Sequence, residues 1–204
     1  MNLKNSYNDN LEKVYQCIEY YLGINVRDVY IEYLNILDFY RCLKSNHNLP
    51  IDLYEHTEFV KDLFINFCSS IPGMYKKKER HVIIRDDSRD DYCLLLAELI
   101  HSKSITQYHQ EIEPWIHEGL PHFLAKVLSE KCQISCKNIK SEWEKFFVIW
   151  ELIYIKNNYN FKILKDIIFT QHIKITKILL KRIFQYGKND ILTLPFEKAI
   201  EMID

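Results

Sequence analysis

Glycine, proline and long apolar runs are all scarce in this chain of 204 residues. Only four glycines and five prolines occur, and neither a low-complexity linker nor an internal repeat interrupts the sequence. We therefore expect a single domain spanning residues 1–204. No stretch approaches the roughly 18–20 consecutive apolar residues that a membrane span requires, so we expect no association with a membrane.

The chain also lacks an excess of charge of either sign. Its formal net charge is −1 at pH 7, so bulk electrostatics give no reason to expect a nucleic acid as partner. The first nine residues contain no apolar segment of the kind that a signal peptide has, which leads us to expect a cytoplasmic protein. Hydrophobic residues make up 48% of the chain and aromatic residues 14%, a composition that favours a folded core over disorder.

The six cysteines show no spacing that indicates a disulfide framework. Cys132 and Cys136 form the only close pair, and no second pair matches them as a structural zinc site would require. We expect reduced, partly buried thiols, as is usual in the cytoplasm. A catalytic thiol is an alternative, for which Cys93 is the best candidate.

Residue periodicity predicts an α+β fold that is mainly helical. A small N-terminal sheet layer is expected within about residues 1–90, two motif helices within about 90–128, and a helical part within about 140–204. The individual helices are predicted at 10–22, 37–44, 55–68, from about 90, 142–155, 161–170, 173–186 and after Pro195, and the strands at 26–34 and 80–86.

The best candidates for catalytic or metal-binding side chains lie between residues 93 and 125. Glu98 and His101 are three apart in an apolar segment, so on a helix they share one face while neighbouring leucines bury the other. Sixteen or so residues later a W-x-x-E-G segment at 115–119 supplies a second carboxylate, Glu118. Either segment alone is a weak signal, and the two together are moderately specific.

These two segments resemble the active site of the gluzincin branch of the zincin metallopeptidases, which comprises thermolysin-like proteins and their minimal relatives. In that family H-E-x-x-H supplies two zinc ligands and a general base, and W-x-x-E-G-[LF]-A supplies the third ligand. The resemblance implies a minimal zincin-like fold with zinc as cofactor, with His101 and Glu118 as ligands and Glu98 as catalytic base. It also implies that the strand at 80–86 is an edge strand that pairs with an extended peptide substrate.

The chain departs from the family pattern at Ala97, where the first histidine ligand would stand. It departs again at His122, where the family usually has an acid that supports that histidine. We interpret the two departures as an exchange in which His122 becomes the third ligand beside His101 and Glu118. Two imidazoles and one carboxylate would then leave a fourth position open, as in a catalytic zinc site.

Other residues near the motif have less defined roles. Pro121 predicts that the helix carrying Glu118 either bends or begins near Leu120. His117 precedes Glu118 and would point about 100° away from it on a continuous helix. No residue is favoured as transition-state stabiliser among the three candidates Tyr108, His109 and Tyr154.

The sequence thus favours a zincin-like metallohydrolase, a peptidase with a rearranged zinc site, in which Glu98 moves the proton. One alternative is a metal-free pseudopeptidase that binds a peptide or protein partner in the same groove. Another is a purely structural helical protein in which the motif is accidental, and a structure lacking the edge strand beside the motif helix would favour it.

Overall fold

The computed structural model describes residues 3–47, 72–76, 80–104, 112–137, 142–170, 172–187 and 190–203, with backbone alone at 3–8, 43–47 and 142. The predicted helix at 55–68 and the candidates Tyr108 and His109 lie outside these ranges.

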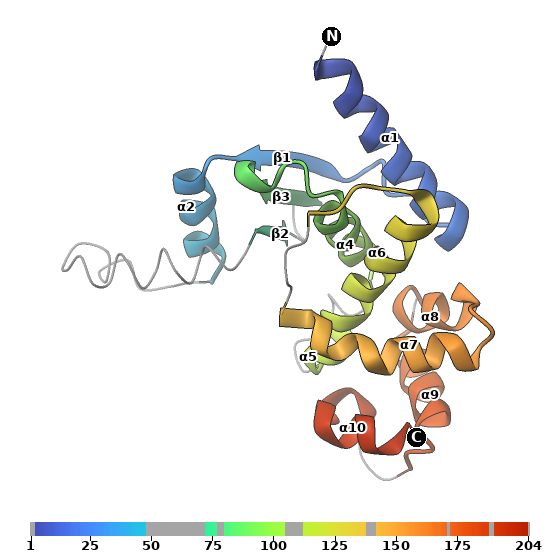
Figure 1. The fold of residues 1–204 in the computed structure, drawn as a ribbon. Coiled ribbons are helices and arrows are strands. Elements are labelled where there is room, and N and C mark those ends of the chain that lie inside the picture. Colours follow the sequence, from blue (N-terminus) through green and yellow to red (C-terminus); the bar gives the residue numbers. More distant parts are fainter. Residues whose placement is uncertain are drawn as a thin grey trace, which may run out of the picture.

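The fold is α+β and mainly helical, as predicted (Figure 1). Its three strands are β1 (Tyr30–Leu34), β2 (Gly73–Lys76) and β3 (His81–Arg85). Its α-helices are α1 (Leu3–Leu22), α2 (Ile36–His47), α4 (Tyr92–Lys103), α5 (Pro114–His117), α6 (Gly119–Cys132), α7 (Phe147–Lys156), α8 (Phe161–Ile168), α9 (Ile173–Ile183) and α10 (Phe196–Met202), with short 3-10 helices at Asp86–Ser88, Glu142–Phe146 and Ile191–Thr193.

The predicted strand at 26–34 is confirmed only from Tyr30 onward. The carboxamide of Asn25 accepts a hydrogen bond from the Arg27 backbone at 2.8 Å, and the amide of Val29 donates to Val26 at 3.1 Å. These bonds close a turn before the strand begins. Val26 and Val29 are nevertheless buried, because the turn directs both side chains into the core.

The sheet has the order β1-β3-β2, with β3 parallel to β1 and antiparallel to β2. The prediction that 80–86 is an edge strand is therefore wrong, since β3 lies in the middle and its backbone is hydrogen-bonded on both sides. All five β3 residues are buried. Ile83 faces Phe39 and Tyr40, while Val82 and Ile84 join the main core. Among the strands in the described part of the chain, β1 and β2 lie at the two edges of the sheet.

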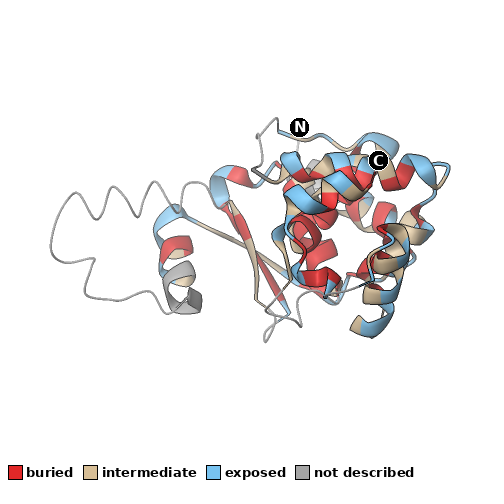
Figure 2. Ribbon diagram, turned by 90° about the horizontal axis from the view of Figure 1, so that it is seen from below, coloured by how far each residue is buried: buried red, intermediate tan, exposed pale blue. Residues whose placement is uncertain are grey.

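Buried residues gather within the helical part of the molecule (Figure 2). There helix α4 packs against the sheet, α1 and α6. The carboxylate of Asp91 caps its first turn by accepting from the backbone of Cys93 and Leu94. Every residue from Leu94 to Ser102 is buried. A helix that is apolar on nearly all sides is typical of such an interior position, which makes the polar Glu98 and His101 exceptional there.

Two disulfides join the helices around α4, so the prediction of reduced thiols is wrong for four of the six cysteines. Cys17 of α1 is bonded to Cys132 at the end of α6, and Cys93 of α4 is bonded to Cys136 just beyond α6. The partners are 115 and 43 residues apart in sequence. Such pairing follows from tertiary packing, which the spacing of cysteines does not reveal.

We expect replacement of both Cys17 and Cys132 by serine to lower the free energy of unfolding by about 2–4 kcal/mol, because a bond across so long a loop restricts the unfolded chain. Urea unfolding without reductant measures the effect. Cys42→Ser is the control, since Cys42 is not in a disulfide. Equal unfolding midpoints for wild type and the double variant would show that the bond contributes nothing.

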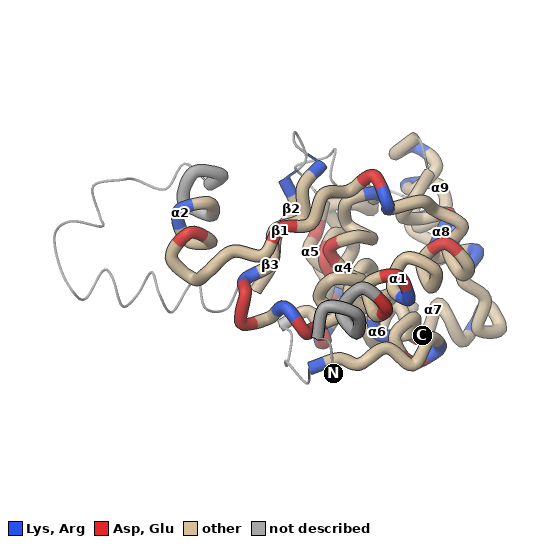
Figure 3. The backbone as a smooth tube through the Cα atoms, turned by 90° about the horizontal axis from the view of Figure 1, so that it is seen from above, with Lys and Arg blue, Asp and Glu red and all other residues tan. Residues whose placement is uncertain are grey.

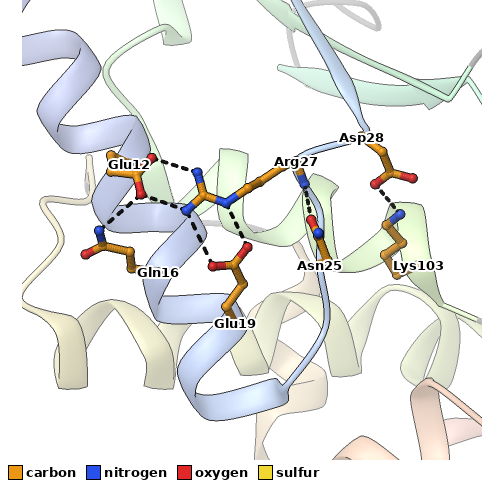
Figure 4. A network of polar contacts seen from close by, with 7 residues as sticks. All are labelled: Glu12, Gln16, Glu19, Asn25, Arg27, Asp28 and Lys103. Carbon is orange, nitrogen blue, oxygen red and sulfur yellow. Dashed lines mark hydrogen bonds and ion pairs between the residues drawn. The ribbon is translucent and has the colours of Figure 1, made fainter.

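A polar network ties α1 to the segment that leads into β1 and to the last turn of α4 (Figure 4). Arg27 makes ion pairs with Glu12 at 2.6 Å and Glu19 at 2.8 Å, both on α1. The next residue, Asp28, accepts from Lys103 at the end of α4 at 2.5 Å. Exposed pairs of this kind contribute little energy individually. The pair between Asp28 and Lys103 nevertheless links the turn before β1 to the end of α4, two residues beyond His101.

Charged residues of both signs are interspersed along the chain when the molecule is viewed from above (Figure 3). Among the helices in the described ranges, none is both long and apolar enough to cross a membrane.

Candidate metal centre

Helix α4 supplies the first two residues of the site, Glu98 and His101, one helical turn apart. Both are almost fully buried, with 8% and 5% of their surface exposed. The prediction that they lie on one helix is confirmed. Ala97, one turn before His101, is completely buried.

Glu118 occupies the junction between α5 and α6, and the W-x-x-E-G segment that contains it has a packing role. The indole of Trp115 donates to the carbonyl of Leu194 at 2.7 Å, and that of Trp150 donates to the carbonyl of Trp115 at 2.8 Å. A Cβ on Gly119 would lie 2.8 Å from the Cβ of Phe146, closer than side chains pack. Trp115 and Gly119 are therefore packing residues that hold Glu118 in place.

Pro121 does not distort this arrangement. Helix α6 begins at Gly119, so Pro121 lies in the first turn, where its missing N–H removes no helical hydrogen bond. Of the two outcomes predicted for this proline, a helix that begins near residue 120 is the one observed. The amide of His122 then donates to the carbonyl of Glu118 at 3.2 Å, which places His122 one turn above Glu118.

The structure brings His101, Glu118 and His122 together. The Nε2 atom of His101 lies 3.0 Å from Oε2 of Glu118, and the Nε2 atom of His122 lies 4.0 Å from the same oxygen. One potential ligand atom from each residue lies within 4.8 Å of the others. Three ligands at about 2.1 Å from one tetrahedral zinc ion are separated by roughly 3.4 Å. The donor set and its spacing therefore fit a zinc ion after small side-chain shifts.

His117 also reaches the site, contrary to the expectation that it points away. Its Nε2 atom lies 3.3 Å from Oε1 of Glu118, and its ring centroid lies 5.2 Å from that of His101. The expectation assumed a continuous helix, whereas α5 ends at His117 and α6 starts beyond Glu118. The signal in the sequence that could have identified His117 is its position directly before Glu118, the proposed carboxylate ligand.

Burial and mutual charge set the protonation of the two acids. Burial raises the pKa of Glu98 to about 7, with His101 opposing and the charge of Glu118 adding to the effect. Burial also acts to raise the pKa of Glu118, but the charge and hydrogen bond of His101, helped by His117 and His122, hold it at about 2. Two neighbouring acids with opposite shifts are typical of sites that separate a proton carrier from a fixed negative charge.

The pKa values of His101 and His122 are also shifted in opposite directions. Burial acts to lower the pKa of His101, but the charge and hydrogen bond of Glu118 prevail and raise it. Burial and the neighbouring His101 lower the pKa of His122 to about 4 against the pull of Glu118. His122 is therefore neutral at pH 7, the form in which imidazole binds metal.

Two further residues border the site and one predicted residue does not. A Cβ on Gly73, the first residue of β2, would lie 3.4 Å from both Cγ and Oε1 of Glu98, so the start of β2 lies beside the proposed base. The ring of Trp143 lies 6.4 Å from that of His122. Tyr154 instead packs its ring against Phe123, Tyr159 and Phe161, and this removes it as a candidate stabiliser.

No family model, curated protein or solved structure matches the chain in comparisons of sequence and of fold. The functional argument therefore depends on the residues and geometry of the site itself.

Proposed function

We propose that this protein is a zincin-like, zinc-dependent metallohydrolase that cleaves peptide bonds, with His101, Glu118 and His122 as the zinc ligands. The observation that carries the proposal is the convergence of these three ligand atoms within 4.8 Å of one another. The exchange between Ala97 and His122 accounts for why the set contains a histidine from α6. The ligand types, two imidazoles and one carboxylate, are those of many catalytic zinc sites.

Each of the remaining site residues has a defined part in such a reaction. A zinc ion held by the three ligands would act as Lewis acid and lower the pKa of water. Glu98 accepts a proton at its carboxylate and returns it to the leaving nitrogen. In the metal-free protein its pKa of about 7 lies near the ambient pH, where a group that must take up and release a proton works best. Glu118, with a pKa of about 2, keeps its negative charge throughout.

The proposed substrate is an extended peptide, and β2 replaces the strand at 80–86 as the element expected to align it. Strand β2 ends the strand order of the described sheet. Its first residue, Gly73, lies beside Glu98, so a peptide aligned along β2 would pass the proposed base. Main-chain pairing with a strand is a common mode of peptide recognition.

A metal-free pseudopeptidase that binds a peptide or protein partner is the second candidate, and one observation favours it. His101 and Glu118 already satisfy each other through a 3.0 Å hydrogen bond. A buried histidine that is paired with a half-buried glutamate needs no metal to be stable. The third alternative, an accidental motif, would be favoured by the lack of an edge strand beside the motif helix. The strand at 80–86 is not at the edge, but β2, which ends the strand order, packs against α4.

Zinc titration and peptide cleavage test the proposal together. We expect about one zinc per chain and hydrolysis of an unstructured protein such as casein that a chelator stops and added zinc restores. A wild-type protein that stays free of metal in excess zinc would contradict the proposal and support the pseudopeptidase.

The cytoplasmic location expected from the sequence stays a prediction, and the two disulfides weigh against it. Disulfides persist mainly in oxidising compartments. With four of six cysteines bonded, the unfolded but unreduced protein should expose no more than two reactive thiols.

A further inference from the structure

The two carboxylate oxygens of Glu118 face different partners. Oε2 lies 3.0 Å from Nε2 of His101 and 4.0 Å from Nε2 of His122. Oε1 lies 3.3 Å from Nε2 of His117. One oxygen is thus directed at the proposed ligand set and the other at a histidine outside it.

His117 is placed to donate and not to bind metal. The 3.3 Å between Nε2 of His117 and Oε1 of Glu118 is within the reach of a hydrogen bond. Because an ionised carboxylate can only accept, such a bond requires the proton on the His117 nitrogen that faces Oε1. Within the described residues, the group of ligand atoms that approach one another to within 4.8 Å consists of His101, Glu118 and His122. His117 does not belong to it, although its ring lies edge-on to His101 with an interplanar angle of 72°.

A carboxylate that binds metal through one oxygen can rotate unless its other oxygen is held. Hydrogen bonds from outside the ligand set hold such groups in orientation, and their loss commonly weakens metal affinity by about 10–100-fold. The backbone around Glu118 is already fixed by Trp115 and Gly119. The remaining freedom is rotation of the side chain, and His117 is the residue in contact with the oxygen that this rotation would displace.

We propose that His117 is a positioning residue, whose Nε2–H donates to Oε1 of Glu118 and thereby directs Oε2 toward His101 and His122. The inference rests on the proposed zinc site and assigns a role to a histidine that the sequence motif leaves unused. It also explains how one carboxylate on a short junction can serve as a ligand without help from a neighbouring acid.

Three variants test this role with zinc affinity as the readout. His117→Phe keeps a ring against His101 but removes the donor, and it should weaken zinc binding by about 10–100-fold. His117→Gln carries an amide N–H at similar reach and should restore most of that affinity. His172→Phe is the matched control, because His172 is an exposed histidine at the start of α9 and its loss should leave zinc affinity unchanged.

The visible spectrum of the cobalt-substituted protein separates positioning from ligation. At saturating cobalt, wild type and all three variants should show the same tetrahedral bands, because the ligand set is the same in each. Unchanged zinc affinity in His117→Phe would overturn the inference and leave the zinc site intact. Altered bands in His117→Phe without recovery in His117→Gln would also overturn it, by showing that His117 is itself a ligand. Absence of any metal binding by the wild type would overturn the proposed function as well.

Discussion

Replacing Glu98 by glutamine should abolish peptide hydrolysis and leave zinc content nearly unchanged. Glu98 is assigned as the proton carrier, and removing a general base or acid commonly costs about 10²–10⁴-fold in rate. The glutamine keeps the shape of the side chain and its place beside Gly73. Elemental analysis beside an assay of cleavage measures both effects, and a parallel loss of zinc would show that Glu98 is a ligand and not a base.

The same substitution should stabilise the metal-free protein at high pH. Burial raises the pKa of Glu98 from its usual value near 4.5 to about 7. Below about pH 4.5 the carboxyl is protonated in both the folded and the unfolded state, so wild type and Glu98→Gln should differ little. Between about pH 4.5 and 7 the unfolded chain releases this proton while the folded state retains it, so the folded state loses stability across that range, and the loss levels off at roughly 3 kcal/mol above pH 7.

Urea unfolding of the metal-free proteins at pH 4 and pH 8 measures this difference. The exposed Glu130 on α6 supplies the control, since Glu130→Gln should change stability by less than about 0.5 kcal/mol at either pH. A Glu98→Gln variant that is no more stable than wild type at pH 8 would mean that Glu98 is not held in an unfavourable buried state.

The second large effect concerns the exchange between Ala97 and His122. His122→Ala should reduce zinc affinity by at least about 100-fold, because a catalytic zinc site rarely has fewer than three protein ligands. The double variant with Ala97→His and His122→Glu should recover most of it, because it builds the H-E-x-x-H ligand pattern that the segment resembles. Isothermal titration with zinc measures all three proteins.

Ala97→His alone supplies the control for the exchange. Ala97 is completely buried, so an added imidazole overpacks the site unless His122 also changes, and this variant should be less stable than the double variant. Intact zinc binding in His122→Ala would contradict the exchange and identify another ligand, with His117 the first residue to examine.

The sequence predicted those parts of the site that depend on local geometry. Glu98 and His101 share a helix face because they are three residues apart, and the leucines between them bury the rest of α4. The contact between Glu118 and His101 was predicted from the joint motif, and the 3.0 Å separation confirms it. Whether these residues carry the proposed roles stays a prediction.

The predictions that were wrong concern features that tertiary packing determines. Strand β3 has the composition of any buried strand, and only the pairing of β1 and β2 on either side shows that it is central. The cysteine pairs join residues 115 and 43 positions apart, a distance over which spacing carries no signal. His117 was misplaced because a two-helix junction at Glu118 replaced the single helix on which the 100° rule depends.

A crystal structure of the wild-type protein with one equivalent of zinc, recorded on both sides of the zinc absorption edge, tests the zinc site most directly. We predict one anomalous peak at about 2.0–2.2 Å from His101, Glu118 and His122, with Glu98 beside it and unbound. A peak whose ligands exclude His122, or no peak while His101 and Glu118 remain hydrogen-bonded to each other, would contradict the account.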